Sequence, residues 1–299
     1  METTIQALEA KRSAARRGYL ICAALGVALV VMLGTHQYTR ALAVAAVTAV
    51  CYFLLARPDI RGFADAYRKA NVQTAMGRWL EDAAYHGKAG TDPEKIRAAR
   101  LLPVKEGNGC ITYHRITGKG AGAEWELCDA TFQVISPGAE GRNQFLSGCW
   151  ITGELEQPTG QWLRMVSRNM VSDALQAPYF LEKTDFRPMA WGREALDREF
   201  CSYAPDGRLP RLPDAVLDRL LELNEKTPGT LALALDDSTL TLMLCHRFVT
   251  AGDPGVRDAV TPERLEQQAL PELEQVLELA KALRLPETGT AEQVDPDQS

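Results

Sequence analysis

"MLGTHQYTRALA", residues 32–43, is a short polar interruption between two of the most apolar runs in the chain. Residues 18–39 contain no Asp, Glu, Lys or Arg, and residues 41–56 are again free of charge, so that only Arg40 separates the two runs. About 20 apolar residues span a bilayer, and flanking arginines extend a slightly short run by placing their guanidinium groups among the headgroups. The interruption therefore predicts the outer turn of a transmembrane helical hairpin over residues 18–57.

Two other interpretations fit apolar runs of this kind. The first is a pair of buried helices in a soluble protein, although two adjacent helices that are apolar all round are rarely found at an extreme N-terminus. The second is a cleavable signal peptide, because "KRSAARR" before an apolar run is a fair n-region. A second apolar run after a gap of about six residues favours the hairpin over both.

The orientation of the hairpin follows from the positive charges beside its ends. Four precede the first run and four follow the second, whereas the loop has only Arg40; the eight are Lys11, Arg12, Arg16, Arg17, Arg57, Arg61, Arg68 and Lys69. Since Lys and Arg stay on the cytoplasmic side, we expect a multi-pass protein of the bacterial inner membrane with both termini in the cytoplasm.

Charge is divided unevenly along the chain. Residues 1–70 hold nine Lys and Arg against four Asp and Glu, a net charge of +5, and the overall charge is −6, so the other 229 residues carry −11. A nucleic-acid-binding protein needs a basic face for phosphate, and the acidic body argues against one. The seven cysteines are scattered without a CxxC, which is a poor disulfide framework and agrees with a reducing compartment.

The rest of the chain divides by composition. We expect a basic cytoplasmic N-terminus over residues 1–17, a linker helix over residues 58–90, a cytoplasmic α+β domain over residues 91–286 and a disordered acidic tail over residues 287–299. The linker helix carries an apolar stripe, which we expect to pack on its own domain; a dimer seam, and hence a homo-oligomer, is the alternative.

Residues 101–168 contain short runs rich in Thr, Val, Ile and aromatic residues, divided by Gly and Pro, which predicts an antiparallel meander. In "CITYHRI" strict alternation would place Cys110, Thr112 and His114 on one face of a strand, and neither face is purely apolar. One side of the sheet is therefore expected to be solvated.

The C-terminal half shows a clearly bounded helix and a leucine-rich hairpin. The helix is expected to start at Pro213 and stop before Pro228-Gly229. In "TLALALDDSTLTLML" the leucines alternate on both sides of an Asp-Asp-Ser turn. This leucine row requires a cover, for which the preceding helix and a terminal helix from Pro271 to Leu285 are the candidates.

The order of these segments resembles a bacterial family of membrane proteins of unknown function, the domain-of-unknown-function 3137 family. The resemblance runs from the N-terminus to about Leu285 and rests on the two close spans, the linker helix, "LLP", "GCITYHRITGKGAGAEWELCDATFQV", "FLSGCWITGEL" and "REFCSYAPD" followed by "LPDAVLDRLLEL" and the leucine hairpin. The chain departs from the family at Leu196, where an aromatic residue is usual, and at Leu212-Pro213, which replaces Leu-Thr-Pro. The resemblance implies a membrane-anchored cytoplasmic α+β domain and carries over no catalytic residue.

Motifs for catalysis, cofactor binding or metal binding are weak, and we predict none of these sites. The chain has no GxSxG, no HExxH and no phosphate-binding glycine loop, because "GKGAG" at residues 118–122 reads as a hairpin turn. The pair Asp236-Asp237 reads as a turn, and Glu154 with Glu156 reads as the solvated face of a strand. Cys110 with His114, and Cys245 with His246, are too few ligands for a metal.

Aromatic residues of the meander are the better candidates for a binding surface. Indole rings on the solvated face of a sheet would be partner-binding anchors, with core packing as the alternative, and the candidates are Trp125, Trp150 and Trp162. We therefore expect a membrane-anchored module that binds a protein or a small ligand, in addition to the lipid bilayer, with a component of an envelope complex as one form of such a module. The alternative is a membrane-tethered enzyme whose site is assembled from residues scattered in the sequence.

Overall fold

The computed structural model describes residues 2–102, 104, 107, 109–134, 144–171, 185–205, 208–227, 231–250, 255–267 and 270–284. The chain divides into two compact units, the first made of residues 1–88 and 248–270 and the second of residues 89–247 and 271–299. The first unit is mostly helical, and the second is built on an antiparallel sheet with helices. The predicted α+β class is therefore confirmed.

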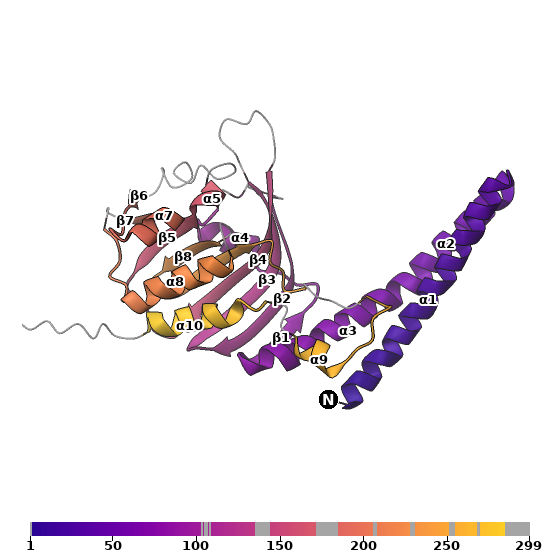
Figure 1. Cartoon of the computed structure of the whole chain (residues 1–299), viewed down its shortest axis with the longest axis horizontal. Helices are drawn as coiled ribbons and strands as arrows, with labels where there is room; N and C mark the ends of the chain where they lie inside the picture. Colours follow the sequence, from indigo (N-terminus) through magenta and orange to yellow (C-terminus); the bar gives the residue numbers. More distant parts are fainter. Residues whose placement is uncertain are drawn as a thin grey trace, which may run out of the picture. The chain divides into compact units, whose positions relative to one another are not determined.

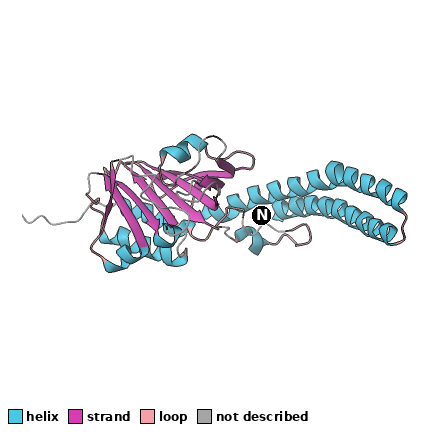
Figure 2. Cartoon of the chain, turned by 90° about the horizontal axis from the view of Figure 1, so that it is seen from above, coloured by secondary structure: helices cyan, strands magenta, loops and turns pink. Residues whose placement is uncertain are grey.

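The first unit begins with two long antiparallel helices, which Figure 2 shows from above. Its elements are α1 (Glu2–Gly34), α2 (Tyr38–Cys51), the π-helix η1 (Tyr52–Ala56), α3 (Arg57–Ala75), the 3₁₀-helix η2 (Met76–Arg78), β1 (Glu81–His86) and α9 (Pro262–Glu266). The chain reverses at Thr35–Gln37, where His36 adopts a left-handed conformation with a φ of 58°. The polar interruption in the sequence is thus the turn of a helical hairpin, as predicted.

Helices α2, η1 and α3 follow one another without a break, although Pro58 lies within the run. Proline lacks a backbone N–H, and its ring clashes with the carbonyl group four residues earlier in a regular α-helix. The wider π turn lies directly before Pro58, and in it the Arg57 N–H donates to the carbonyl oxygen of Tyr52, five residues back. The π turn therefore relieves the proline clash, and the second apolar run and the linker form one continuous helix.

The ends of the helical segments differ from the expected ones. The linker helix, expected to reach residue 90, ends at Ala75, and a 3₁₀ turn closes it before strand β1 begins at Glu81. In this turn the N–H groups of Trp79 and Leu80 both donate to the carbonyl oxygen of Met76, next to Gly77, which weakens a helix. Residues 2–17, expected as a basic N-terminus, are the first turns of α1.

Residues 248–270 belong to the first unit, so the expected body over residues 91–286 is interrupted by them. Their side chains close a small core against α1 and α3, which consists of Leu8, Ala15, Phe63, Tyr67, Ala70, Val260 and Leu265. We call the part of this segment that the structure describes, residues 255–267, the strap. Nothing in its own sequence has the periodicity of a core element, which is why it escaped prediction.

The second unit contains eight strands in the order β2-β3-β4-β9-β8-β5-β7-β6, each antiparallel to its neighbours (Figure 1). The strands are β2 (Cys110–Gly120), β3 (Ala123–Val134), β4 (Gln144–Leu155), β5 (Trp162–Ser167), β6 (Phe186–Met189), β7 (Phe200–Pro205), β8 (Leu231–Asp236) and β9 (Thr239–Cys245). The helices are α4 (Pro93–Ala98), α5 (Arg168–Val171), α7 (Glu194–Glu199), α8 (Asp214–Lys226) and α10 (Leu273–Leu283).

The predicted meander is correct for β2, β3 and β4 but wrong for β5. The leucine hairpin β8–β9 lies between β4 and β5, so that β5 pairs with β8 and β7. Both faces of the hairpin are buried, because small or apolar residues such as Ala232, Ala234 and Met243 alternate with the leucines. A hairpin that is apolar on both faces is stable only at the centre of a sheet.

Helices α8 and α10 cover one face of this sheet, and α4 and α5 pack on the other. Figure 1 shows α8 and α10 side by side across the face that carries the leucine row, as predicted for the leucine cover. The opposite face packs against Ile96 of α4 and Met170 of α5. Helix α8 begins at Asp214, one residue later than expected, and α10 begins at Leu273. The expected acidic tail, residues 287–299, lies outside the described residues.

A bulge in β2 changes the expected alternation of "CITYHRI". The register shifts between Tyr113 and Ile116, and His114 has a φ of 59°. Cys110 therefore lies opposite Phe132, on the α4 face, whereas Ile116 lies opposite Leu127, on the other face. One extra residue in a strand moves every later side chain to the opposite face of the sheet. The expected common face of Cys110, Thr112 and His114 is therefore wrong for His114, which lies in the bulge.

Candidate functional site

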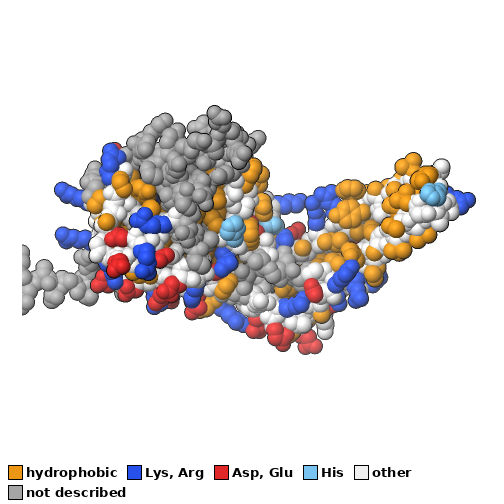
Figure 3. All heavy atoms as spheres, turned by 45° about the horizontal axis from the view of Figure 1, so that its top comes forward, with side chains coloured by type: hydrophobic (Ala, Val, Ile, Leu, Met, Phe, Trp, Pro, Cys, Tyr) orange, Lys and Arg blue, Asp and Glu red, His pale blue; other side chains and the backbone are white. Residues whose placement is uncertain are grey.

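Most of the exposed large hydrophobic side chains among the described residues lie on the helical hairpin. Two helical runs, residues 2–34 and 38–78, are long and apolar enough to cross a membrane, with mean hydropathies of 2.0 and 1.8 in their most apolar windows. Their exposed side chains include Leu20, Ile21, Val27, Val30, Val31, Leu33, Leu42, Val47, Val50, Phe53, Leu54 and Leu55. Figure 3 shows these hydrophobic side chains in orange along the hairpin. A surface of this extent favours contact with an apolar solvent or partner.

The two helices of the hairpin approach most closely at Gly18. A β-carbon added to Gly18 would lie 2.9 Å from the α-carbon of Ala56, so only glycine fits there. Ala15 and Ala56 are also buried beside it. Small residues let helices pack backbone to backbone, which is the usual way for helices to associate where burial from water cannot drive them together.

Polar contacts fix the strap to the base of the hairpin. The Glu9 carboxylate accepts a hydrogen bond from the backbone N–H of Val260 at 2.6 Å and pairs with Arg12 at 2.6 Å. On α3, the Tyr67 hydroxyl donates to the Arg264 carbonyl oxygen at 2.9 Å, and the Asn71 amide donates to the carbonyl oxygen of Leu265 at 2.9 Å. The side chains of α1 and α3 thus satisfy backbone groups of a segment with little secondary structure of its own.

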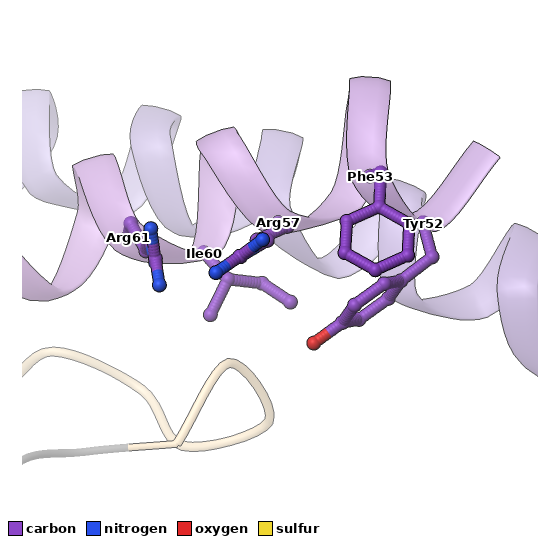
Figure 4. Close-up of a pocket in the computed structure, with 5 residues that line it drawn as sticks. All are labelled: Tyr52, Phe53, Arg57, Ile60 and Arg61. Carbon is purple, nitrogen blue, oxygen red and sulfur yellow. The ribbon is translucent and has the colours of Figure 1, made fainter. Parts of the chain in front are cut away.

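An open groove of about 440 Å³ lies on the helix where the apolar run ends (Figure 4). It is lined by Tyr52 and Phe53 of η1 and by Arg57, Ile60 and Arg61 of α3. The Arg57 guanidinium lies over the Phe53 ring, 5.4 Å from its centroid. The sequence analysis used Arg57 to extend the second apolar run and both Arg57 and Arg61 for orientation, and it missed the groove, although their spacing of four residues places them on one helix face.

Two of the three tryptophans expected on a binding surface are core residues. Trp125 and Trp150 are 2% and 1% exposed, so neither ring is available to a partner. Each indole N–H is satisfied internally, Trp125 by the Gly120 carbonyl oxygen at 2.8 Å and Trp150 by the Thr152 hydroxyl at 3.0 Å. Trp162, which is 44% exposed at the start of β5, is still a candidate.

A second exposed patch lies on the sheet and was not predicted. Ile111, Tyr113 and Phe145 are 58%, 37% and 65% exposed. Their pairing with Thr131, Asp129 and Gln133 of β3 puts all three on one face of the sheet. This part of the sheet has the solvated face that the mixed polarity of "CITYHRI" predicts.

The cysteines are free thiols, most of them within the sheet. Burial raises the pKa of Cys110 to about 11 and that of Cys245 to about 12, and it raises the pKa of the fully buried Cys149 as well. Thiols with raised pKa values are protonated at neutral pH and react slowly. Within the described ranges, no three His, Cys, Asp or Glu side chains gather as metal ligands would.

The carboxylates singled out in the sequence have structural contacts. Asp236 pairs with the buried Arg164 at 2.7 Å, and the Arg164 guanidinium lies 4.7 Å from the centroid of the Phe186 ring. Burial lowers the pKa of Arg164, which nonetheless stays charged at neutral pH. Asp237 lies in the turn of the leucine hairpin, as predicted.

The strand carboxylates Glu154 and Glu156 are exposed, in agreement with a solvated strand end. The Glu154 carboxylate accepts a hydrogen bond from the Thr239 hydroxyl at 3.2 Å, and Glu156 pairs with Arg284 at 3.5 Å. Each carboxylate therefore joins β4, or the residues just after it, to a neighbouring element.

Comparison of the chain with protein-family models, curated proteins and solved structures gives no match.

Proposed function

We propose that the chain is a membrane-anchored protein whose helical hairpin crosses the bacterial inner membrane twice and holds an α+β body in the cytoplasm. The observation that carries this proposal is the exposure of the hairpin: none of the residues in the most apolar 18-residue window of α1 is buried in the structure. Exposure of that apolar surface to water is unfavourable in free energy, whereas contact with the acyl chains of a bilayer removes this cost.

The distribution of arginine and lysine supports the orientation. Four arginines lie close in sequence to the contact between Gly18 and Ala56, at the end of the two apolar runs that is opposite the turn. They are Arg16, Arg17, Arg57 and Arg61. Only Arg40 lies at the opposite end, where it donates to the Gln37 side chain at 2.9 Å. The positive ends belong on the cytoplasmic side and the turn on the far side.

The proposed role of the body is binding, with a protein or small ligand as the partner. The open patch formed by Ile111, Tyr113 and Phe145 supports this role, because exposed apolar side chains grouped on one face are typical of interaction surfaces. It favours a binding module over an enzyme, for which an enclosed cleft with convergent polar groups would be the supporting feature. Kinship with the domain-of-unknown-function 3137 family is part of the proposal and rests on the order of motifs in the sequence.

Cysteine accessibility tests the topology. A Gln37→Cys variant should react with a membrane-impermeant maleimide in intact cells, and a Glu124→Cys variant, at an exposed position of β3, should react only after the cells are opened. The unsubstituted protein gives the background from the native thiols. Labelling of Glu124→Cys in intact cells would place the body outside the cytoplasm and contradict the proposed orientation.

Extraction tests the anchor separately from its orientation. The protein should stay with the membrane pellet in alkaline carbonate and leave it only with detergent, as expected for helices that span the bilayer. Release by carbonate alone would mean that the hairpin does not cross the membrane, whichever side the body occupies.

A further inference from the structure

The groove on η1 and α3 combines two cations with an apolar wall. Figure 4 shows Arg57 and Arg61 on successive turns of one helix side, with Ile60 between them and the rings of Tyr52 and Phe53 beside them. The rings are 44% and 55% exposed, so neither is part of a protein core. A guanidinium pair next to exposed aromatic rings suits a ligand that is anionic at one end and apolar at the other.

The positive charge in the groove has no counter-ion among the residues that the structure describes. Among the described residues, neither Arg57 nor Arg61 has an ion-pair partner. Asp59, the carboxylate nearest in sequence, is two residues from each and therefore faces away from both. Like charges four residues apart repel each other on a helix, and an anion bound between them would turn that repulsion into attraction.

The position of the groove specifies the kind of anion. Between the two aromatic residues and the two arginines, Leu54 and Leu55 are 70% and 53% exposed, so the apolar surface proposed to lie in the bilayer ends at the groove. Ala56 then packs against Gly18, and α1 has Arg16 and Arg17 on the same side of that contact in the sequence. The groove thus lies at the level where the phosphates of the cytoplasmic leaflet would be found.

We propose that this groove binds the phosphate group of an anionic phospholipid, with Arg57 and Arg61 on the phosphate and with Tyr52, Phe53 and Ile60 along the glycerol and the first acyl carbons. The inference rests on the proposed membrane anchor and adds a defined lipid site to it. The π turn contributes to the groove, because it keeps the helix continuous through Pro58. The two aromatic residues and the two arginines are therefore held on one helix.

Lipid titration of the full-length protein in detergent tests the site. Short-chain phosphatidylglycerol is added, bound lipid is counted by native mass spectrometry, and short-chain phosphatidylcholine is the neutral reference. A cation near an anionic lipid surface contributes enough that each of Arg57→Gln and Arg61→Gln should weaken phosphatidylglycerol binding about five-fold, and the double variant about thirty-fold. Phosphatidylcholine binding should not change.

A matched control removes the same charge elsewhere. The double variant Arg198→Gln with Arg219→Gln loses two exposed guanidinium groups of the body, one on α7 and one on α8, and should bind phosphatidylglycerol like the unsubstituted protein. Equal weakening in the control would show that net charge alone governs binding and would overturn the site. Equal affinity for the two lipids in the unsubstituted protein would overturn it as well.

A further arm separates the lipid from free phosphate. Inorganic phosphate should compete only weakly, because it cannot use the aromatic and aliphatic wall; binding of phosphate as tight as that of the lipid would overturn the assignment to a phospholipid. Failure of the lipid site and failure of the anchor are distinguishable, since carbonate extraction reports the anchor without reference to Arg57 or Arg61.

Discussion

Cys149 is fully buried in β4, in the part of the sheet between Asp129 of β3 and Leu244 of β9. Burial raises its pKa and raises the pKa of Cys110 to about 11 and of Cys245 to about 12. A raised pKa means that the folded state retains these protons while the unfolded state loses them near its ordinary pKa of about 9. We therefore expect stability to be unaffected by these thiols below pH 9 and to fall as the pH rises from about 9 toward 12.

Thiol counting with a chromogenic disulfide reagent checks the burial. At neutral pH the folded protein should react slowly at the buried thiols and fully only after denaturation. A variant with Ala at Cys149 and Cys245 should lose the corresponding thiols from the denatured count without changing the initial folded-state rate. A fast, stoichiometric reaction of the native protein at Cys149 would contradict the structure of the sheet.

Arg164 and Asp236 form a pair that is buried on one side only: the Arg164 side chain is 3% exposed and that of Asp236 is 31%. Replacing Asp236 with Asn leaves the buried guanidinium without its carboxylate, so we expect a loss of about 1–3 kcal/mol in the free energy of unfolding. Replacing both residues together, as Arg164→Met with Asp236→Leu, should restore most of it. Urea unfolding followed by tryptophan fluorescence measures both, and a double variant less stable than Asp236→Asn would contradict this account.

The residues that sequence reasoning misassigned share a physical cause. Trp125 is amphipathic, and the pattern alone does not show whether its N–H bonds to water or to the protein. The signal for burial lay on the adjacent strand: a β-carbon on Gly153, the cross-strand neighbour, would lie 2.7 Å from the Trp125 ring. A glycine opposite a tryptophan indicates a ring folded over the neighbouring strand, but only once the register is known.

At the level of elements, the pairing of α1 with the opposite helix depends on one glycine. Gly18→Leu should push the helices apart, because even a β-carbon would lie 2.9 Å from the Ala56 α-carbon. Gly26→Leu is the matched control, since nothing lies within 4 Å of its added β-carbon. Hydrogen–deuterium exchange of the detergent-solubilised protein should rise at α1 and α3 in the first variant alone, and equal exchange in both would refute the close contact.

The leucine hairpin and α8 should unfold as one element pair. Leu220 of α8 and Leu233 of β8 are 1% and 3% exposed, and truncating a buried leucine to alanine usually lowers stability by about 2–5 kcal/mol. We expect each of Leu220→Ala and Leu233→Ala to lower the midpoint of thermal unfolding, and their effects to be non-additive if the two share a cavity. Arg219→Ala, on the exposed side of α8, should change the midpoint little. Strict additivity would mean that the helix does not pack on the hairpin.

The types of the helices and strands were predictable where the periodicity was strong, but the strands with which each strand pairs were not. The alternating leucines predict β8 and β9, yet the position of the pair between β4 and β5 depends on Ala232 and Ala234, whose small side chains let the second face be covered. The bulge at His114 has no signature in the letters "CITYHRI", because any residue at that position would continue the alternation. The expected boundary between the hairpin and the linker helix, at residues 57 and 58, lies inside one continuous helix, in which a π turn directly precedes Pro58.

At the scale of the whole molecule, the strap depends on a carboxylate. Its hydrogen bond with Arg12 and the Val260 N–H hold the pKa of Glu9 below its ordinary value of about 4.5, against the opposing effect of burial. A lowered pKa gives a contribution to stability that is present above pH 4.5 and is lost as the pH falls through the folded-state pKa. Relative to the intrinsic exchange rate at each pH, the protection of the Val260 amide should therefore decrease on acidification below about pH 4.5, whereas a Glu9→Gln variant should have lower protection at neutral pH and show little further change.

The strap also shows what a single sequence leaves open at this scale. The hairpin was evident because its two apolar runs form a long, uniform pattern, but a segment held by backbone carbonyl groups of Arg264 and Leu265 leaves no such pattern. Its partners Tyr67 and Asn71 lie 197 and 194 residues earlier, a separation that periodicity does not bridge. The groove at Arg57 is similar, since its shape depends on the π turn as well as on the spacing of charges.

Glu9 and Val260 are 251 positions apart, and this has a consequence for synthesis. A ribosome adds about 5–20 residues per second, so roughly 10–50 seconds pass between the emergence of α1 and that of its strap. During that interval Leu8, Phe63 and Tyr67 have no cover from Val260 and Leu265. The base of the hairpin is thus completed only after translation has passed the whole sheet, and a nascent chain stalled before residue 260 would present an open apolar surface to chaperones and proteases.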